Sequence, residues 1–181
     1  AAAPGVNIFG NVSTAYETPT TVELSNTPTG EGGFNQELGP QDLRSFEGGV
    51  RGLIAPARLR YELAVYASTV DNALVSFQNP DEQTFFRNAG VSSRDGIEFL
   101  VEWVPNASFN TRFAYTYQHF VFDRFVTGSS DFSGNIEPGA PPHRTFAGFN
   151  YTAPFGLRSG ATVRWVDRHT LNNKNTVFNW A

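Results

Sequence analysis

The residue types that most often perform catalysis or bind metals are present, but their spacing favours neither role. Three histidines, His119, His143 and His169, stand far apart, and none forms an H-x-x-x-H pair. No serine lies in a G-x-S-x-G motif, and no plausible triad accompanies the serines that are present. The absence of cysteine excludes thiolate metal sites and disulfides. We therefore expect no catalytic residues, no metal site, no cofactor and no enzymatic activity.

Charged side chains instead recur at every second position of strand-like segments. In the segment Gly96–Phe122, Glu98, Glu102 and Arg112 alternate with apolar and aromatic residues. Side chains of a strand point alternately to its two faces, so this hairpin has one apolar face and one charged face. Further charged residues fit the same polar face of neighbouring segments, namely Glu47, Arg51, Arg58, Arg60 and Glu62. We interpret this face as an ion-paired wall.

The period-two pattern predicts an all-β chain of about seven long strands. The predicted strands are Val6–Tyr16, Arg44–Ile54, Arg58–Thr69, the two strands of Gly96–Phe122 around a turn at Val104–Ser108, Arg144–Thr152 and Arg158–Arg168. About ten residues at roughly 3.3 Å each, tilted near 45°, cover about 23 Å. This height matches the apolar band of about 25 Å in an outer-membrane barrel, whereas strands in globular proteins average about five or six residues. In a soluble sandwich, by contrast, the apolar face would form the core.

The connections between the predicted strands alternate strictly in length. The long ones are Glu17–Leu43, Val70–Val91 and Asp123–Pro142, and the short ones are Ala55–Ala57, Val104–Ser108 and Ala153–Gly156. Short strands are expected inside the second long segment, near Leu74–Phe77 and Thr84–Arg87. Alternating loop lengths are typical of an antiparallel up-and-down barrel, with long loops at one end and short turns at the other.

Aromatic residues fall near both ends of the predicted strands, on the apolar face. Tyr61, Trp103, Phe109 and Tyr151 lie near the short turns, and Tyr16 and Tyr117 lie near the long segments. Two aromatic girdles of this kind mark the two interfaces of a membrane barrel.

Composition agrees with a barrel and argues against several other classes. The chain has 181 residues, a net charge of −4 and a mean hydropathy of −0.31, and no apolar run approaches the length of a membrane helix. This net charge does not indicate a nucleic-acid-binding surface. Because the sequence has no methionine and opens AAAPGV without the pattern of a signal peptide, we expect it to be a piece of a longer protein.

Several motifs, taken together in their order, resemble those of the TonB-dependent outer-membrane receptors of the ferric-siderophore type, in the C-terminal part of the barrel. They are NIFGNVSTAYETPTTVEL (Asn7–Leu24), GGFNQELGPQDLRSFEGGVRG (Gly32–Gly52), YELAVYASTVDNALV (Tyr61–Val75), NAGVSSRDGIE (Asn88–Glu98) and PGAPPHR (Pro138–Arg144). Gln36 stands where the family usually has proline, and Gln41 where it has glutamate. Ser45-Phe46-Glu47 replaces the usual Tyr-Glu.

The resemblance implies that residues 1–181 are a partial β-barrel domain, roughly strands thirteen to nineteen of a 22-stranded transmembrane barrel. The plug domain, the first strands and the last strands would lie outside the chain. The implied location is the bacterial outer membrane. The implied partners are outer-membrane lipid, the rest of the barrel, a ferric siderophore or other large ligand, and TonB acting through the plug. No nucleic-acid partner is expected.

In such receptors the ligand is bound by the upper lumen, the outer loops and the plug. The matching residues on the lumenal face are Gln118 and Arg168, with Arg124 just above them, and the planar guanidinium of arginine suits anionic chelates. The charged face is then either an ion-paired lumen wall or a contact surface for the plug. Two alternatives remain at this point: a soluble, secreted all-β module that binds carbohydrate, and a passive porin.

Overall fold

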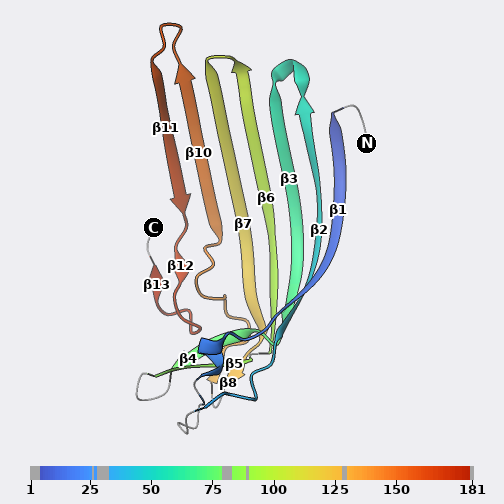
Figure 1. The fold of residues 1–181 in the computed structure, drawn as a ribbon, viewed down its shortest axis with the longest axis vertical. Helices are drawn as coiled ribbons and strands as arrows, with labels where there is room; N and C mark the ends of the chain where they lie inside the picture. The colour runs from blue at the N-terminus through green and yellow to red at the C-terminus, as the bar shows by residue number, and fades with distance from the viewer. Residues whose placement is uncertain are drawn as a thin grey trace.

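Seven long antiparallel strands form one sheet in the computed structural model, which describes residues 5–25, 27, 33–78, 83–88, 90–127 and 130–179. The strands are β1 (Val6–Glu17), β2 (Gln41–Ile54), β3 (Leu59–Asp71), β6 (Val91–Asn106), β7 (Phe109–Arg124), β10 (His143–Thr152) and β11 (Arg158–Val166). Their order across the sheet follows the sequence, β1-β2-β3-β6-β7-β10-β11. The predicted meander is therefore confirmed, and Figure 1 shows it as an open, curved sheet.

The strand register places apolar and charged residues on opposite faces, as the alternation predicted. One row of neighbouring residues runs Leu63, Phe99, Tyr115, Thr145 and Trp165. We call the face with this row the apolar face. The opposite face, the charged face, has a row in which Arg60, Glu102 and Arg112 are neighbours. Parity along each strand then assigns Trp103 and Trp165 to the apolar face and Glu98, Arg112 and Arg164 to the charged face.

The three short turns lie at one end of the sheet and the three long connections at the other (Figure 1). The first turn is a 3₁₀ helix, η1 (Ala55–Ala57), and it ends at Arg58 in the left-handed conformation with φ 49°. Arg58 therefore belongs to the turn rather than to the strand that the sequence predicted.

Several strands are longer than predicted, since β2 begins at Gln41, β6 begins at Val91 and β7 ends at Arg124. Two further predicted boundaries were wrong for local reasons. The turn expected at Val104–Ser108 is confined to Ala107 and Ser108, because β6 continues to Asn106 through a register shift after Trp103. The last long strand ends at Val166 rather than Arg168, and the Asp167 carboxylate accepts a hydrogen bond from the Arg168 backbone N–H at 2.7 Å.

The long connections contain secondary structure of their own. The predicted short strands form a hairpin, β4 (Leu74–Gln78) and β5 (Thr84–Asn88). Three elements were not predicted: the helix α1 (Thr21–Leu24), the pair β8 (Val126–Thr127) and β9 (Ser130–Asp131), and the pair β12 (His169–Thr170) and β13 (Phe178–Asn179). Within the described ranges, no helix is long and apolar enough to cross a membrane.

A small apolar core lies where the long connections meet β7. Phe122 and Phe125 are buried and contact each other edge to face with ring centroids 4.9 Å apart. Val75 of β4 and Phe132 contact this pair. The core therefore joins the second and third long connections to the end of the sheet.

Candidate functional site

The third long connection lies along the end of β7, beyond the start of β10. Because β10 begins opposite Tyr117, the remaining length of β7 needs another partner. The segment 134–142 provides it: the backbone N–H of Gln118 donates to Pro142 O at 2.9 Å, and that of Glu137 donates to Phe120 O at 2.9 Å. Prolines at 138, 141 and 142 lack the N–H that a regular ladder needs, so this pairing is irregular.

A largely buried ion pair fixes this segment to the charged face. Glu137 is 9% exposed and accepts two hydrogen bonds from the Arg94 guanidinium, at 2.9 and 3.2 Å. The Ser92 hydroxyl, which is fully buried, also donates to the Glu137 carboxylate. Paired, charge-assisted hydrogen bonds of this geometry are stronger and more directional than neutral ones. The segment 134–142 is thus anchored as well as paired.

The C-terminal hairpin lies against the same segment and is held mainly by asparagine side chains. The Asn175 amide bonds both backbone groups of Ile136: its oxygen accepts from Ile136 N–H and its nitrogen donates to Ile136 O, each at 2.8 Å. The Asn135 amide donates to Asn173 O at 2.7 Å. Asn175 itself has φ 54°, a conformation that asparagine tolerates better than most residues. These contacts build a second layer over β7.

A cavity of about 420 Å³ lies between the end of β7, the segment 134–142 and the C-terminal hairpin. Gln118, on the charged face of β7, is 9% exposed and lines this cavity. The Arg168 guanidinium lies 4.5 Å from the centroid of the Phe178 ring. The other polar residues of the lining are His119, Asp167, His169, Thr170 and Asn175. An amide, a guanidinium and an aromatic ring that line one cavity are suited to bind a polar, partly planar group.

The structure brings together two of the three residues that the sequence singled out. Gln118 and Arg168 line the same cavity although they are fifty positions apart. Arg124 does not: it is exposed at the last position of β7, opposite Val91 and beyond a register shift. The sequence did not reveal the roles of Glu137 and Asn175. These two residues help to form the cavity because their side chains hold the segment 134–142 in place. The Asn-rich tail was the available signal, because asparagine side chains often bond nearby backbone groups.

A second cavity of about 370 Å³ lies between the first long connection and the β4–β5 hairpin. Asn88 holds these parts together: its amide exchanges hydrogen bonds with the N–H and C=O of Gly39 at 2.8 and 2.9 Å. The Arg87 guanidinium lies 3.7 Å from the Phe77 ring centroid, and burial lowers its pKa from the ordinary value. Across the described ranges, no group of three His, Asp or Glu side chains is arranged to hold a metal ion.

Replacing Asn175 by glycine is expected to loosen the C-terminal hairpin without straining the backbone. Glycine keeps the left-handed conformation but removes both hydrogen bonds to Ile136, which contribute about 1–3 kcal/mol to local stability. Hydrogen exchange of the Ile136 amide should accelerate about tenfold or more. Asn173→Ala is the comparison within the hairpin, since Asn173 accepts the hydrogen bond from Asn135 through its backbone oxygen rather than its side chain. Equal protection of Ile136 in Asn175→Gly and in the unmodified protein would contradict the assignment.

The architecture of this sheet is that of an outer-membrane barrel wall. It is an antiparallel meander with one apolar face, aromatic residues near both ends of its strands and long connections at one end. The amino-acid sequence matches the family described as "TonB dependent receptor-like, beta-barrel" over residues 1–180. The chain belongs to this family, whose members are bacterial outer-membrane proteins. In the wall of such a barrel the apolar face is the outer face, and the charged face, here called the lumenal face, lines the lumen.

Solved structures with the same fold include three outer-membrane transporters and receptors. The siderophore receptor PiuA from Acinetobacter baumannii gives a TM-score of 0.76 at 19% identity, with 97% of this chain and 26% of that chain covered. The ferric yersiniabactin uptake receptor FyuA from Yersinia pestis gives 0.72 at 15% identity, with 97% and 26% covered. The copper transporter OprC gives 0.72 at 15% identity, with 94% and 26% covered. The chain thus spans about a quarter of the length of these structures.

Proposed function

We propose that this chain forms part of the barrel of a TonB-dependent transporter that takes up a ferric siderophore or a similar large ligand. The barrel of a member of this family surrounds a lumen, and the cavity at Gln118 lies at the long-connection end of the lumenal face. This position of the cavity is the main observation in support of the proposed function. The family match supports the transporter over a soluble carbohydrate-binding module, and the TonB-dependent class supports it over a passive porin.

In this proposal Gln118 and Arg168 contact the ligand from the wall of the lumen, and Arg124 contacts it from the rim. The Gln118 side chain lines the cavity, and its amide can both donate to and accept from a polar ligand group. The Arg168 guanidinium supplies positive charge and a planar fork for carboxylate, catecholate or hydroxamate oxygens. Energy coupling would pass through a plug domain and TonB.

The uptake test uses the complete receptor in iron-starved cells that lack other iron receptors. Radioactive iron is supplied as a catecholate, a hydroxamate or a carboxylate chelate, with and without an uncoupler of the proton gradient. We expect one chelate class to be accumulated, and accumulation to stop when the uncoupler is added. Uptake that persists unchanged in uncoupled cells would identify a passive porin instead, and a copper complex is the control suggested by the similarity to OprC.

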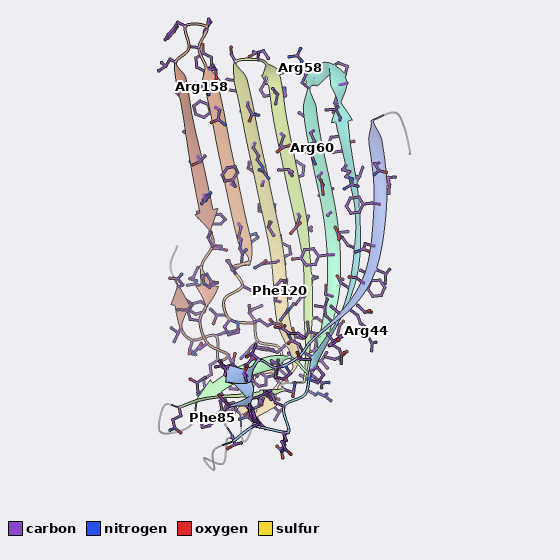
Figure 2. All side chains as sticks on the ribbon, in the orientation of Figure 1. Arg44, Arg58, Arg60, Phe85, Phe120 and Arg158 are labelled. Atoms are coloured by element: carbon purple, nitrogen blue, oxygen red, sulfur yellow. The ribbon has the colours of Figure 1, made fainter. Side chains whose placement is uncertain are left out.

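Substitutions in the cavity are expected to weaken binding of the accumulated chelate. Gln118→Ala and Arg168→Ala each remove a polar contact worth about 1–3 kcal/mol, so the dissociation constant should rise about tenfold. Arg124→Ala, at the exposed rim, should have a smaller effect. Arg44→Ala is the matched control: Arg44 lies near the same end of the sheet but on the apolar face, away from the lumen (Figure 2). Equal binding by all four variants would contradict the site.

A further inference from the structure

A shallow groove of about 540 Å³ lies on the apolar face of β1, β2 and β3. Its lining includes two neighbouring register rows of this face, Gly10–Gly48–Val65 and Val12–Phe46–Ala67. The side chains of the second row protrude, with Val12 70% and Phe46 60% exposed. Because glycine has no side chain, the first row is a gap beside them. We call this feature the glycine groove.

The backbone of the sheet does not require the two glycines of this groove. Neither Gly10 nor Gly48 has a positive φ, and a Cβ at either position would lie 3.8 Å from its nearest neighbouring atom. Gly49 is different, because a Cβ there would clash with Leu63 O and with the Phe9 ring on the charged face. Glycine inside a strand weakens the strand and often marks a place where another molecule approaches the backbone closely.

A single arginine lies just beyond the glycine groove on the same face, near the long-connection end of β2 (Figure 2). Arg44 is one register row from Phe46, about 7 Å along the strand at roughly 3.4 Å per residue. It is exposed and has no ion pair among the described residues. Its register neighbours, Thr14 and Thr69, carry hydroxyl groups. The next row holds Tyr16 of the aromatic girdle, so the arginine lies near a membrane interface.

Acidic residues limit the positive region to the neighbourhood of Arg44. On the apolar face of β1, β2 and β3, Arg44 is the only basic residue. Asp42 and Asp71 are register neighbours one row farther from the groove, and Asp95 on β6 lies 3.5 Å from His119. An anionic group is therefore attracted to Arg44 on its groove side and repelled beyond it. A molecule with an anionic head at Arg44 would extend its apolar part into the groove.

We propose that the glycine groove and Arg44 bind one phosphorylated membrane lipid at a fixed place on the outer face of the barrel. An acyl chain lies over Gly10 and Gly48, where no side chain fills the gap, and the phosphate accepts paired hydrogen bonds from the Arg44 guanidinium. The hydroxyls of Thr14 and Thr69 can donate to the remaining phosphate oxygens. The inference rests on the barrel wall that the family match shows, and not on the transport of any ligand.

Native mass spectrometry of the complete receptor tests the lipid chemistry, with phosphatidic acid added to receptor that detergent has stripped of lipid. We expect one tightly held copy per receptor, weak retention of a diacylglycerol with the same chains, and no displacement by an excess of inorganic phosphate. Equal retention of the diacylglycerol would show apolar contact alone, and displacement by phosphate would show an anion site without a lipid. Either result would overturn the proposal.

Two substitutions separate the head and the chain of the lipid. Arg44→Gln removes the guanidinium and Gly48→Leu fills the gap, so each should raise the dissociation constant about tenfold. Arg51→Gln makes the same charge change on the charged face of β2, and Ala147→Leu adds apolar bulk at an exposed position of the apolar face of β10; both should bind normally. Heat-modifiable gel mobility confirms that each variant is folded.

Normal lipid binding by folded Arg44→Gln or Gly48→Leu, or an equal loss in Arg51→Gln, would contradict the proposal. A receptor dimer that Gly48→Leu converts to a monomer would also contradict it, because a second copy of the chain would then occupy the groove.

Photolabelling in a bilayer provides a measurement that does not depend on detergent. The complete receptor is placed in phosphatidylcholine vesicles with a small fraction of phosphatidic acid that carries a diazirine near the end of one acyl chain. We expect peptide mapping to find more label at residues 10–12 and 46–48 than around Ala147, and Arg44→Gln to abolish this preference. Uniform labelling of the apolar face would overturn the proposal, since the lipid would then have no fixed place.

Discussion

Val101→Arg is expected to destabilise the receptor in a bilayer by about 2–4 kcal/mol, because Val101 lies on the apolar face of β6, near the middle of its apolar stretch. On this face, β6 is apolar from Trp103 to Ile97, and the next residue on the face is Asp95. Unpaired charge in the hydrocarbon region has no water or counter-ion to replace its hydration.

Leu100→Arg is the matched control for this prediction. Leu100 is adjacent, aliphatic and similarly half-buried, but it faces the lumen between Glu62 and Ala114. The fraction of folded receptor in the outer membrane, measured by heat-modifiable gel mobility, should fall strongly for Val101→Arg and little for Leu100→Arg. A larger loss for Leu100→Arg would mean that the two faces have been assigned the wrong way round.

Removal of the Glu137 carboxylate is expected to release the third long connection from the barrel wall. In Glu137→Ala, the Arg94 guanidinium loses two hydrogen bonds and its only ion pair among the described residues, while the side chain stays about two-thirds buried. Leaving a largely buried charge without its partner costs about 2–3 kcal/mol, below the range for fully buried pairs because Arg94 retains some contact with water.

Hydrogen exchange measures this effect locally. The backbone amide of residue 137, which bonds Phe120 O, should exchange about thirtyfold to a hundredfold faster in Glu137→Ala, while amides in the middle of β6 keep their protection. Glu102→Ala is the comparison, since Glu102 lies in an exposed ion-pair row with Arg60 and Arg112 and should change stability by less than about 1 kcal/mol. Unchanged protection in Glu137→Ala would show that the backbone pairing alone holds the segment.

The long strands could be predicted because their pattern depends only on which face each residue meets. In an outer-membrane barrel an apolar outer face and a polar lumenal face impose alternation along every strand, so the patterns of Ile97–Trp103 and Phe109–Tyr117 predict both conformation and orientation. Pairing order followed from the alternating loop lengths. The strand ends were less predictable, because a register shift after Trp103 extends β6 past Pro105 in a way that no periodicity records.

The candidate site was only partly predictable, because it depends on contacts between distant loops. Gln118 and Arg168 were found from their faces on adjacent parts of the barrel wall, and the structure places them in one cavity. The Asn175 side-chain amide bonds the backbone of Ile136, and the Glu137 carboxylate bonds the Arg94 guanidinium. Neither contact follows from a periodic pattern in the sequence. The helix α1 did have a recognisable signal, since Thr20 and Glu23 form a capping box.

The most direct test of this account is a spin-label scan of β6 in the complete receptor, reconstituted in lipid vesicles. Single cysteines replace each residue from Gly96 to Trp103 in turn, and each label is exposed to oxygen, which concentrates in lipid, and to a water-soluble nickel chelate. The account predicts a period of two: labels at 97, 99, 101 and 103 collide preferentially with oxygen, and labels at the even positions do not. Absence of alternation, or preferential oxygen contact at the even positions, would contradict the assignment of this sheet as a lipid-facing barrel wall.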